Sequence, residues 1–359
     1  MDKIENFKSG FVNIVGNPNV GKSTLMNQLV GDRLSIITNK SQTTRHRIIG
    51  IVNSERMQIV YSDTPGVLKP KYRMQEDMLS FSRSALEDAD ILLYVTDTIE
   101  KADKNADFVA QVAKLDTPVL VLINKADLMS QEELAALIES WRDRLPNATE
   151  ILPLAALHGA GIPYLKERIP ELLPVAPPYF DEDALTDRPA RFFVSEIIRE
   201  KIFLYYQEEI PYSCEVVIDS FKESDDLIRI TGRIYVERES QKGIIIGKGG
   251  VALKKVSTLA RRDLEKFFGK KIFLRLEVEV SDDWRNSDRA LRSWCGNVIV
   301  MSLMRCDESS GLAFEVHRVV VKLTAHMVGN PRRRENCEER RRKHHRKNLE
   351  IPHPKRFQR

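Results

Sequence analysis

The chain has 359 residues, of which 42% are hydrophobic and 30% charged, so it is long enough for two globular domains that each bury a core. No apolar run approaches the roughly 18 to 20 residues that span a bilayer, and residues 1–10 lack the apolar centre of a secretory signal. The four cysteines lie far apart without a CxxC pair, which argues against a disulfide framework and favours a reducing compartment. We therefore expect a cytoplasmic protein.

The net charge of +4 is unevenly distributed along the chain. Residues 331–359 hold twelve Lys or Arg and four Glu, a net charge of +8, which leaves −4 for residues 1–330. The basic balance therefore belongs to the C-terminal segment, and the overall charge is no argument that the folded part binds nucleic acid.

Short apolar runs rich in β-branched residues alternate with amphipathic stretches over the first half of the chain. The predicted strands are residues 11–15, 57–63, 90–97, 118–124 and 150–154. The predicted helices are residues 22–30, 75–88, 102–113 and 131–144. Nearly continuous apolar runs of this length are typical of strands buried on both faces of a parallel sheet. The alternation predicts a doubly wound, mostly parallel α/β domain over residues 8–174.

The sequence GNPNVGKS fits the phosphate-binding pattern G-x-x-x-x-G-K-[ST] and lies between a predicted strand and a predicted helix. Lys22 would reach the β and γ oxygens of a nucleoside triphosphate, and the Ser23 hydroxyl would bind Mg²⁺. A glycine turn that only connects a strand to a helix would not need this Lys-Ser pair. The expected phosphate-binding residues are Gly16, Asn17, Pro18, Asn19, Val20, Gly21, Lys22, Ser23 and Thr24. The pattern predicts a P-loop.

Two polar segments between the P-loop and the third predicted strand are candidates for sensing the γ-phosphate. In DTPG (63–66), Asp63 would hold Mg²⁺ through a water and the N–H of Gly66 would contact the γ-phosphate. In SQTTRHR (41–47), Thr44, or alternatively Thr43, would complete the metal shell when GTP is bound. The expected metal ligands are thus Ser23, Thr44 and Asp63. The neighbouring Thr64, Pro65 and Val67 are expected to line the nucleotide site.

The sequence NKAD (124–127) follows an apolar strand and predicts the base that is bound. A carboxylate at Asp127 can accept from both the ring N–H and the exocyclic amine of guanine, and adenine offers no such pair of donors. Rejection of a ligand that leaves such groups unpaired is worth ~10⁴-fold or more. Asn124 would bridge the base edge and the P-loop, Lys125 would pack over the ring, and Ala126 lies between them. The pattern alone is weak, but in register with the P-loop it predicts guanine specificity.

Residues 175–190, rich in proline and acids, interrupt the periodicity and are predicted to be a linker. A small α+β domain is predicted beyond it, over residues 191–283. Its expected elements are a helix (191–206), two strands (213–222 and 227–237), a glycine loop, a helix (251–268) and a strand (271–280).

The second glycine loop, IIIGKGG, contains a G-x-x-G at Gly247 to Gly250 before the predicted helix. By itself this pattern is common, and it can be no more than the turn at the start of a helix. Apolar and basic neighbours and the order of elements instead favour a type II KH domain, whose loop clamps about four nucleotides of single-stranded RNA. The expected RNA-binding residues are Lys242, Ile246, Gly247, Lys248, Gly249, Gly250, Lys254 and Lys255.

Taken together, GNPNVGKST, QTTRHRIIGI, DTPG, NKAD and the second glycine loop resemble the Era family of bacterial ribosome-assembly GTPases over residues 8–294. The resemblance implies a GTP-hydrolysing switch that binds the 3′ end of 16S rRNA and acts in assembly of the 30S ribosomal subunit. It also implies a monomer, with a peripheral contact to the inner face of the cell membrane.

For catalysis, the resemblance implies roles for Lys22, Asn19, Thr44 and Gly66, with K⁺ held near Asn19 in place of an arginine finger. Val67 stands where many GTPases carry a glutamine that orients the attacking water. Because valine cannot hydrogen-bond to water, we expect slow intrinsic hydrolysis.

The chain departs from the family in the fifth guanine loop, which usually reads Ser-Ala-x and here is Ala155, Ala156 and Leu157. The backbone N–H of Ala156 can still contact the guanine oxygen. We therefore expect guanine binding to survive with some loss of loop rigidity.

Residues 284–294 are the last part of the chain that resembles the family. Residues 295–359 form an atypical basic tail that holds three of the four cysteines and five of the seven histidines, and we predict that it is disordered or non-native. One alternative is a basic arm that adds phosphate affinity. A metal site at Cys337, His344 and His345 would lack a complete ligand set.

Two other functions were open at the level of sequence. A GTP-dependent RNA-modifying or other RNA-processing enzyme would need a second catalytic constellation, and His46 and His158 are isolated in the sequence. A purely RNA-binding protein with a degenerate nucleotide site would not need the intact Lys22, Ser23 and Asp127.

Overall fold

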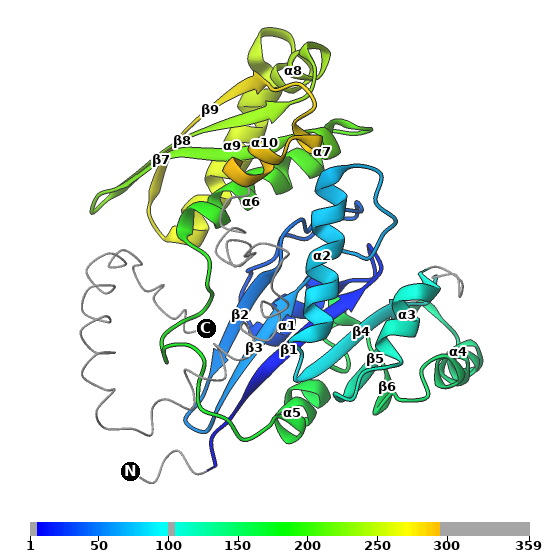
Figure 1. The fold of residues 1–359 in the computed structure, drawn as a ribbon. Coiled ribbons are helices and arrows are strands. Elements are labelled where there is room, and N and C mark those ends of the chain that lie inside the picture. Colours follow the sequence, from blue (N-terminus) through cyan, green and yellow to red (C-terminus); the bar gives the residue numbers. More distant parts are fainter. Residues whose placement is uncertain (1–5, 100–104, 295–359) are drawn as a thin grey trace, which may run out of the picture.

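The computed structural model describes residues 6–99 and 105–294, which form two sheets, each with its own helices (Figure 1). The strands of the first sheet are β1 (Lys8–Gly16), β2 (Ile48–Asn53), β3 (Met57–Asp63), β4 (Ile91–Asp97), β5 (Val119–Asn124) and β6 (Glu150–Pro153). Their order is β2-β3-β1-β4-β5-β6, and all neighbours are parallel except β2 and β3. Strands β4 and β5 are buried throughout, as their apolar sequences require.

Helices cover both faces of this sheet. They are α1 (Lys22–Val30), α2 (Arg73–Glu87), α3 (Ala106–Val112), α4 (Gln131–Arg144) and α5 (Ile162–Leu172). Side chains of α1 and α5 pack in one core, and side chains of α2, α3 and α4 pack in another. Helix α4 begins at a capping box in which Ser130 and Glu133 bond to each other's backbone N–H. This is the doubly wound architecture predicted from the sequence.

Two elements of the first domain were not predicted. Strand β2 is an antiparallel edge strand, and its sequence IIGIVN follows a polar segment without a turn signal. Helix α5 carries an internal proline, Pro170. Helix α3 begins at Ala106 rather than at residue 102, and residues 100–104 are outside the described part of the chain.

The second sheet has three strands in the order β7-β8-β9. Its elements are α6 (Ala190–Tyr205), α7 (Ile210–Ser213), β7 (Glu215–Glu223), β8 (Leu227–Val236), α8 (Glu239–Ile246), the 3₁₀ turn η3 (Lys248–Gly250), α9 (Val251–Phe268) and β9 (Lys271–Val280). Strands β7 and β8 are antiparallel, whereas β8 and β9 are parallel. The apolar triplet before the glycine loop, expected to be part of a loop, is the end of helix α8. The loop therefore connects two helices.

The segment 175–190 connects the two sheets and also packs along the first one. The backbone N–H of Ile51 in β2 donates to the Leu185 carbonyl at 2.8 Å, and the Thr186 hydroxyl donates to the Ile49 carbonyl at 2.7 Å. Tyr179 stacks edge-on against Phe11, with ring centroids 4.9 Å apart. The segment is therefore bound to the edge of the sheet rather than acting as a free spacer.

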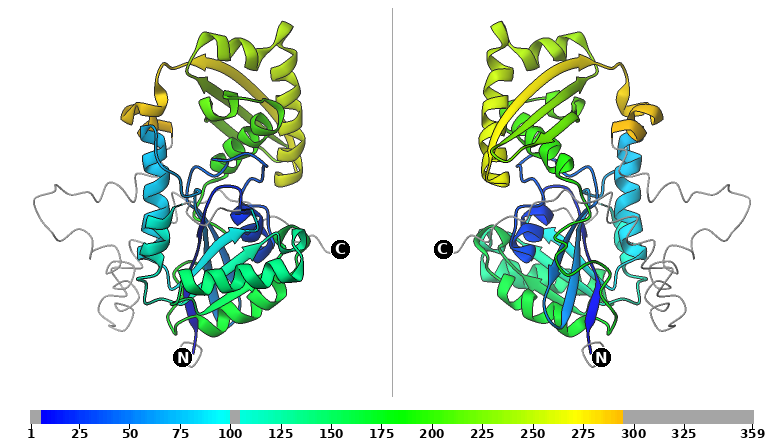
Figure 2. Two further views of the ribbon diagram at one scale, coloured as in Figure 1. Left: turned by 90° about the vertical axis from the view of Figure 1, so that its right-hand side faces the viewer. Right: turned by 90° about the vertical axis from the view of Figure 1, so that its left-hand side faces the viewer.

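Besides this connecting segment, an apolar contact joins the two domains. The last described elements are the 3₁₀ turn η4 (Trp284–Asn286) and helix α10 (Asp288–Trp294), which lie against one end of α2 (Figure 2). Trp284 is fully buried with Met74 and Met78 of α2, and its indole N–H donates to the Ser213 carbonyl at 3.0 Å. The expectations for residues 295–359, the metal site at Cys337 among them, lie outside the described residues. None of the described helices is both long enough and apolar enough to span a membrane.

Candidate nucleotide site and RNA-binding loop

The P-loop is a tight turn between β1 and α1 whose shape depends on two glycines. A Cβ on Gly16 would lie 2.0 Å from the Val95 carbonyl oxygen, and one on Gly21 would lie 2.1 Å from the Asn124 amide nitrogen. Both glycines also have positive φ angles, 145° and 97°, which side chains disfavour. The ammonium of Lys22 folds back into the loop and donates to the carbonyls of Gly16 and Asn17 at 3.0 and 2.8 Å. The loop therefore forms a closed cradle around a buried cation.

The three expected metal ligands meet next to this cradle. The Ser23 hydroxyl donates to Asp63 Oδ2 at 2.7 Å, and the Thr44 hydroxyl lies 2.9 Å from the Ser23 hydroxyl and 3.5 Å from Asp63 Oδ2. The other carboxylate oxygen of Asp63 is buried and has no hydrogen-bond partner among the described residues. Burial raises the pKa of Asp63, partly opposed by its hydrogen bond from Ser23 and by the charge of Lys22. Two hydroxyls and a buried carboxylate that lacks a partner fit Mg²⁺, which prefers oxygen ligands.

Thr44, rather than the alternative Thr43, faces these groups. The Thr43 hydroxyl instead lies 2.6 Å from the Thr38 hydroxyl and donates to the Lys40 carbonyl at 2.8 Å. Just before it, the side-chain amide oxygen of Gln42 accepts from the Tyr72 hydroxyl at 3.1 Å. Residues 43–47 are all buried, so the whole segment is enclosed by its neighbours.

The DTPG segment touches the P-loop directly. A Cβ on Gly66 would lie 2.7 Å from Pro18, and the Val67 N–H donates to the Gly16 carbonyl at 3.1 Å. The Val67 side chain is 4% exposed and packs in the core beside α2 and α3. The Val67 carbonyl accepts from the Asn105 amide at 2.9 Å, a contact that the sequence analysis missed. The position that would orient water is thus occupied by a buried apolar group.

Asn124 connects the loops that follow β5 and β6 to the P-loop. Its amide nitrogen donates to the Val20 carbonyl at 2.7 Å, and its oxygen accepts from the Ala156 N–H at 2.9 Å. Lys125 donates to the Asn19 carbonyl at 2.9 Å and to Asp97 at 2.6 Å. Asp97 was not among the predicted residues, because an acid at the end of a strand carries no signal of its own. These bonds fix the P-loop, the loop at Asn124 and the loop at Ala156 relative to one another.

Asp127 lies at the open side of this arrangement. Its side chain is 38% exposed, and its carboxylate is 3.7 Å from His158 Nε2. The loop that contains Ala155 is closed by two backbone bonds, Ala155 N to Ala160 O at 3.1 Å and Ala160 N to Ala155 O at 3.2 Å. These bonds do not require a serine hydroxyl at position 155.

The other expected nucleotide-site residues lie around these loops. Ala126 donates its N–H to the Leu154 carbonyl at 3.1 Å, and the Thr64 hydroxyl donates to the Ile14 carbonyl at 2.8 Å. The Pro65 carbonyl accepts from the Ser82 hydroxyl of α2 at 2.8 Å. Thr24 is in the first turn of α1. Leu157 is 75% exposed.

The second glycine loop joins α8 to α9 and is exposed. Gly247, Gly249 and Gly250 have φ angles of 71°, 61° and 77°. A Cβ on Gly247 would lie 2.7 Å from Ala252, so this position cannot accept a side chain without a shift. Exposed apolar side chains flank the loop, Ile244 at 50% and Val251 at 67%.

The basic residues expected to bind RNA surround this loop. Lys248, Lys254 and Lys255 are exposed, whereas Lys242 and Ile246 in α8 are partly buried. Cations beside exposed apolar groups suit a strand of RNA, whose phosphates need charge and whose bases need apolar contact.

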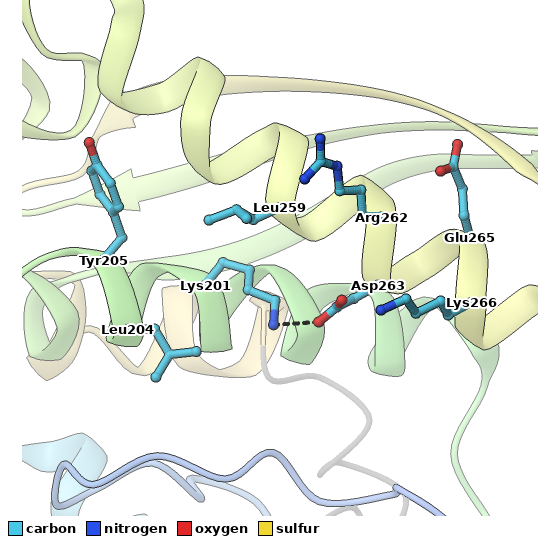
Figure 3. Close-up of a pocket in the computed structure, with 8 residues that line it drawn as sticks. All are labelled: Lys201, Leu204, Tyr205, Leu259, Arg262, Asp263, Glu265 and Lys266. Atoms are coloured by element: carbon cyan, nitrogen blue, oxygen red, sulfur yellow. Dashed lines mark ion pairs between the residues drawn. The ribbon is translucent and has the colours of Figure 1, made fainter.

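A groove of about 690 Å³ lies apart from both sites, between α6 and α9 (Figure 3). Its lining residues are Lys201, Leu204, Tyr205, Leu259, Arg262, Asp263, Glu265 and Lys266. Lys201 of α6 and Asp263 of α9 form an ion pair at 2.5 Å in this lining. The sequence analysis did not single out these residues.

The fold and the two loops define a class of protein, a P-loop GTPase with a C-terminal KH domain. Residues 11–125 match the family described as 50S ribosome-binding GTPase, and residues 209–285 match the KH domain family.

The chain belongs to the Era family of GTPases. GTPase Era of Syntrophus aciditrophicus (strain SB) is 45% identical over 291 residues, which cover 80% of this chain and 95% of that protein. GTPase Era of Leuconostoc citreum (strain KM20) is 43% identical over 292 residues, 80% of this chain and 96% of that protein. The resemblance stated from the sequence motifs is confirmed.

Solved structures agree with this assignment. A structure of Era in complex with MgGDPNP and nucleotides 1506–1542 of 16S ribosomal RNA has a TM-score of 0.77 at 39% identity, over 80% of this chain and 98% of that one. An Aquifex aeolicus Era variant bound to GDP·AlF₄⁻ also has a TM-score of 0.77 at 39% identity, over 80% of this chain and 99% of that one. The predicted fold class, an α/β GTPase domain followed by a KH domain, is confirmed.

Proposed function

We propose that this chain is a GTP-hydrolysing switch that binds the 3′ end of 16S rRNA and acts in maturation of the 30S ribosomal subunit. The observation that carries the proposal is the meeting of Ser23, Thr44 and Asp63 beside the P-loop, in a chain that also presents an exposed KH loop. The solved Era complex with MgGDPNP and 16S rRNA nucleotides supports both halves of it.

The nucleotide chemistry depends on charge placed around the phosphates. Lys22, released from the loop carbonyls that it now contacts, would bind the β and γ oxygens, and the Gly66 N–H would contact the γ-phosphate. Mg²⁺ held by Ser23, Thr44 and Asp63 would supply further positive charge to the same oxygens. Since Val67 is buried and apolar, no side chain at that position orients the attacking water, and we infer slow intrinsic hydrolysis.

Several finer expectations are part of the proposal. The domain limits 8–174 and 191–283 and the residue roles given above belong to it. A K⁺ site near Asn19, whose φ is 66°, would add positive charge beside the phosphates. A monomeric state and a peripheral contact with the inner membrane surface rest on the family resemblance, and a cytoplasmic location rests on the cysteine spacing and the polar residues 1–10.

An RNA-modifying enzyme that uses GTP is the alternative, and the structure offers it little support. Among residues 6–99 and 105–294, no group of three or more His, Cys, Asp or Glu could hold a metal ion. His46 is 8% exposed, so it is enclosed rather than presented to a substrate. His158 is exposed beside Asp127, within the nucleotide site.

The proposal is tested by measuring the affinity of the full chain for a labelled single-stranded 16S rRNA 3′-end oligonucleotide, with GDPNP, GDP or no nucleotide. Lys22→Ala should lose nucleotide binding, and its RNA affinity should no longer respond to nucleotide. Coupling is reciprocal, so the factor by which GDPNP changes RNA affinity must equal the factor by which RNA changes GDPNP affinity. An RNA affinity that is the same in every nucleotide state would leave two independent modules and contradict the switch.

A further inference from the structure

The segment 42–47 lies between the two domains and is attached to both. Thr44 faces the nucleotide site, and the next residue, Arg45, reaches into the KH domain. Arg47, two residues further on, is bound to the first domain, where it donates to the Ser62 hydroxyl of β3 at 2.6 Å and to Asp88 at the end of α2 at 2.6 Å. Thr44, which is expected to bind the metal, is thus adjacent to a residue that the KH domain binds.

The Arg45 guanidinium is enclosed by the KH domain. Its Nη1 donates to Glu215 Oε2 at 2.6 Å and to the Cys214 carbonyl at 2.7 Å, and its Nη2 donates to the Pro211 carbonyl at 3.1 Å. The Arg45 side chain is 2% exposed and the Glu215 side chain 7%. The rings of Phe203 and Trp284 lie close by, each with its centroid 5.9 Å from the guanidinium carbon.

Glu215 supplies the negative charge that compensates the buried Arg45 guanidinium. Burial alone would raise the pKa of Glu215, but the charges of Arg45 and Arg199 hold it below its ordinary value, so the carboxylate is ionised at neutral pH. A buried cation that loses its partner is strongly destabilised. A neutral Glu215 would therefore weaken the hold on Arg45, whose remaining bonds to the Cys214 and Pro211 carbonyls do not compensate its charge.

The position of Arg45 restricts Thr44, because adjacent Cα atoms are about 3.8 Å apart. With Arg45 fixed in the KH domain and Arg47 fixed on the sheet, Thr44 has little freedom to leave Ser23 and Asp63. In nucleotide switches, this segment is ordered by the γ-phosphate and its Mg²⁺ and released after hydrolysis. The ion pair favours the ordered arrangement.

We propose that Glu215, a residue of the KH domain, is a positioning residue for GTP hydrolysis, because it holds Arg45 and through it keeps Thr44 at the metal site. The inference rests on the proposed function. If so, the KH domain not only responds to the bound nucleotide but also supplies a residue that orders the nucleotide site.

The test compares Glu215→Gln with Glu196→Gln in the full chain. Glu196 is a matched control because it is also buried in the KH domain, with 4% of its side chain exposed against 7% for Glu215, but pairs with Arg199 at 2.8 Å instead of Arg45. Affinities for GDPNP and GDP are measured with Mg²⁺. Because Thr44 is needed only when the γ-phosphate is present, Glu215→Gln should weaken GDPNP binding by about fivefold or more, within the usual range of coupling, and leave GDP binding unchanged. Glu196→Gln should leave the ratio of the two affinities as in the wild type.

The route through Thr44 is tested by combining substitutions. In a Thr44→Ala background, Glu215→Gln should cause no further loss of GDPNP affinity, since residues that act through one another are not additive. A loss that persists in this background, or an equal loss in Glu196→Gln, would overturn the inference. If urea unfolding shows that Glu215→Gln does not fold, Glu215→Asp, which keeps the charge on a shorter side chain, is measured instead, with a smaller loss expected. A wild type that fails to hydrolyse GTP would contradict the proposed function itself, which distinguishes the two failures.

Discussion

Two adjacent threonines carry the same hydroxyl but have different surroundings. Thr44 lies 2.9 Å from the Ser23 hydroxyl, whereas Thr43 donates to the Lys40 carbonyl at 2.8 Å. The sequence alone could not choose between them, because a one-residue shift in an irregular segment leaves no periodic signal. The choice is fixed by Arg45 and Arg47, whose partners are 170 and 41 residues away in the sequence.

This difference predicts the effects of removing each hydroxyl. Thr44→Ala should lower the rate of GTP hydrolysis about 10²-fold, the usual effect of losing one group that stabilises the transition-state charge. Thr43→Ala should leave the rate near that of the wild type. Single-turnover hydrolysis with saturating enzyme measures both rates. Equal losses in the two variants would mean that Thr44 has no special relation to the metal.

His46 predicts how stability depends on pH. Burial lowers the pKa of His46 to about 4. The charges of Glu196 and Glu215 oppose this shift, and those of Arg188 and Arg199 add to it. A base whose pKa is depressed in the folded state binds fewer protons than in the unfolded state, so stability is lost as pH falls from about 6.5 towards 4. The loss from this one group would be about 2 to 3 kcal/mol.

Urea unfolding at pH 7 and at pH 4.5 tests this expectation. His46→Gln should lose less stability between the two pH values than the wild type does. His158→Gln is the control, because that side chain is 63% exposed, and its loss should match that of the wild type. If all three proteins lose the same free energy of unfolding between pH 7 and pH 4.5, His46 is not the cause of the loss of stability in acid.

At the scale of elements, the sequence was informative where a pattern is local and repeated. Helices α1, α4 and α9 begin and end at the predicted residues, and each carries an apolar stripe or a cap. Helix α8 was missed because Gly243 and three consecutive isoleucines are poor helix formers. It forms because Ile245 is buried against the second sheet, a tertiary effect that overrides propensity.

The candidate site follows the same rule. The glycine-rich loops were predicted, since their residues are contiguous and their spacing is fixed by the phosphate. The ion pair of Arg45 with Glu215 and the contacts of Asp97 and Asn105 were not. Each joins residues far apart in the chain, and a single charged or amide residue does not indicate its partner.

The loop between α8 and α9 predicts how RNA binding depends on salt. Lys248 is exposed in the loop, so Lys248→Ala should remove one phosphate contact and lower the slope of log affinity against log salt by about 0.7 for single-stranded RNA. Nucleotide affinity should not change. Lys266→Ala, at the other end of α9, should leave the slope unaltered. Filter binding over a series of KCl concentrations measures the slopes, and equal slopes in wild type and Lys248→Ala would contradict a phosphate contact.

At the scale of the whole molecule, the two domains are joined by a buried tryptophan. Trp284 packs on Met74 and Met78 and contacts both domains, so its removal should affect how they unfold together. Trp284→Ala should cost about 3 to 5 kcal/mol, as for other buried aromatic side chains. The remaining interface should then no longer couple the domains into one transition.

Calorimetry tests this coupling. We expect one main transition in the wild type and two separated transitions in Trp284→Ala. Trp284→Phe keeps most of the apolar contact and loses the bond to the Ser213 carbonyl, so it should lie between the two. A single transition with an unchanged midpoint in Trp284→Ala would show that other contacts, such as the Arg45 ion pair, suffice.

The segment 175–190 has a consequence for the outer margin of the first sheet. A strand at a sheet margin offers free backbone donors and acceptors to the strands of other molecules. Here Leu185 and Thr186 occupy the donor of Ile51 and the acceptor of Ile49, so the connecting peptide shields β2 from intermolecular pairing. A protease cut just before Leu185 would therefore leave the second fragment bonded to β2 through residues 185 and 186, and these residues would continue to cover that strand.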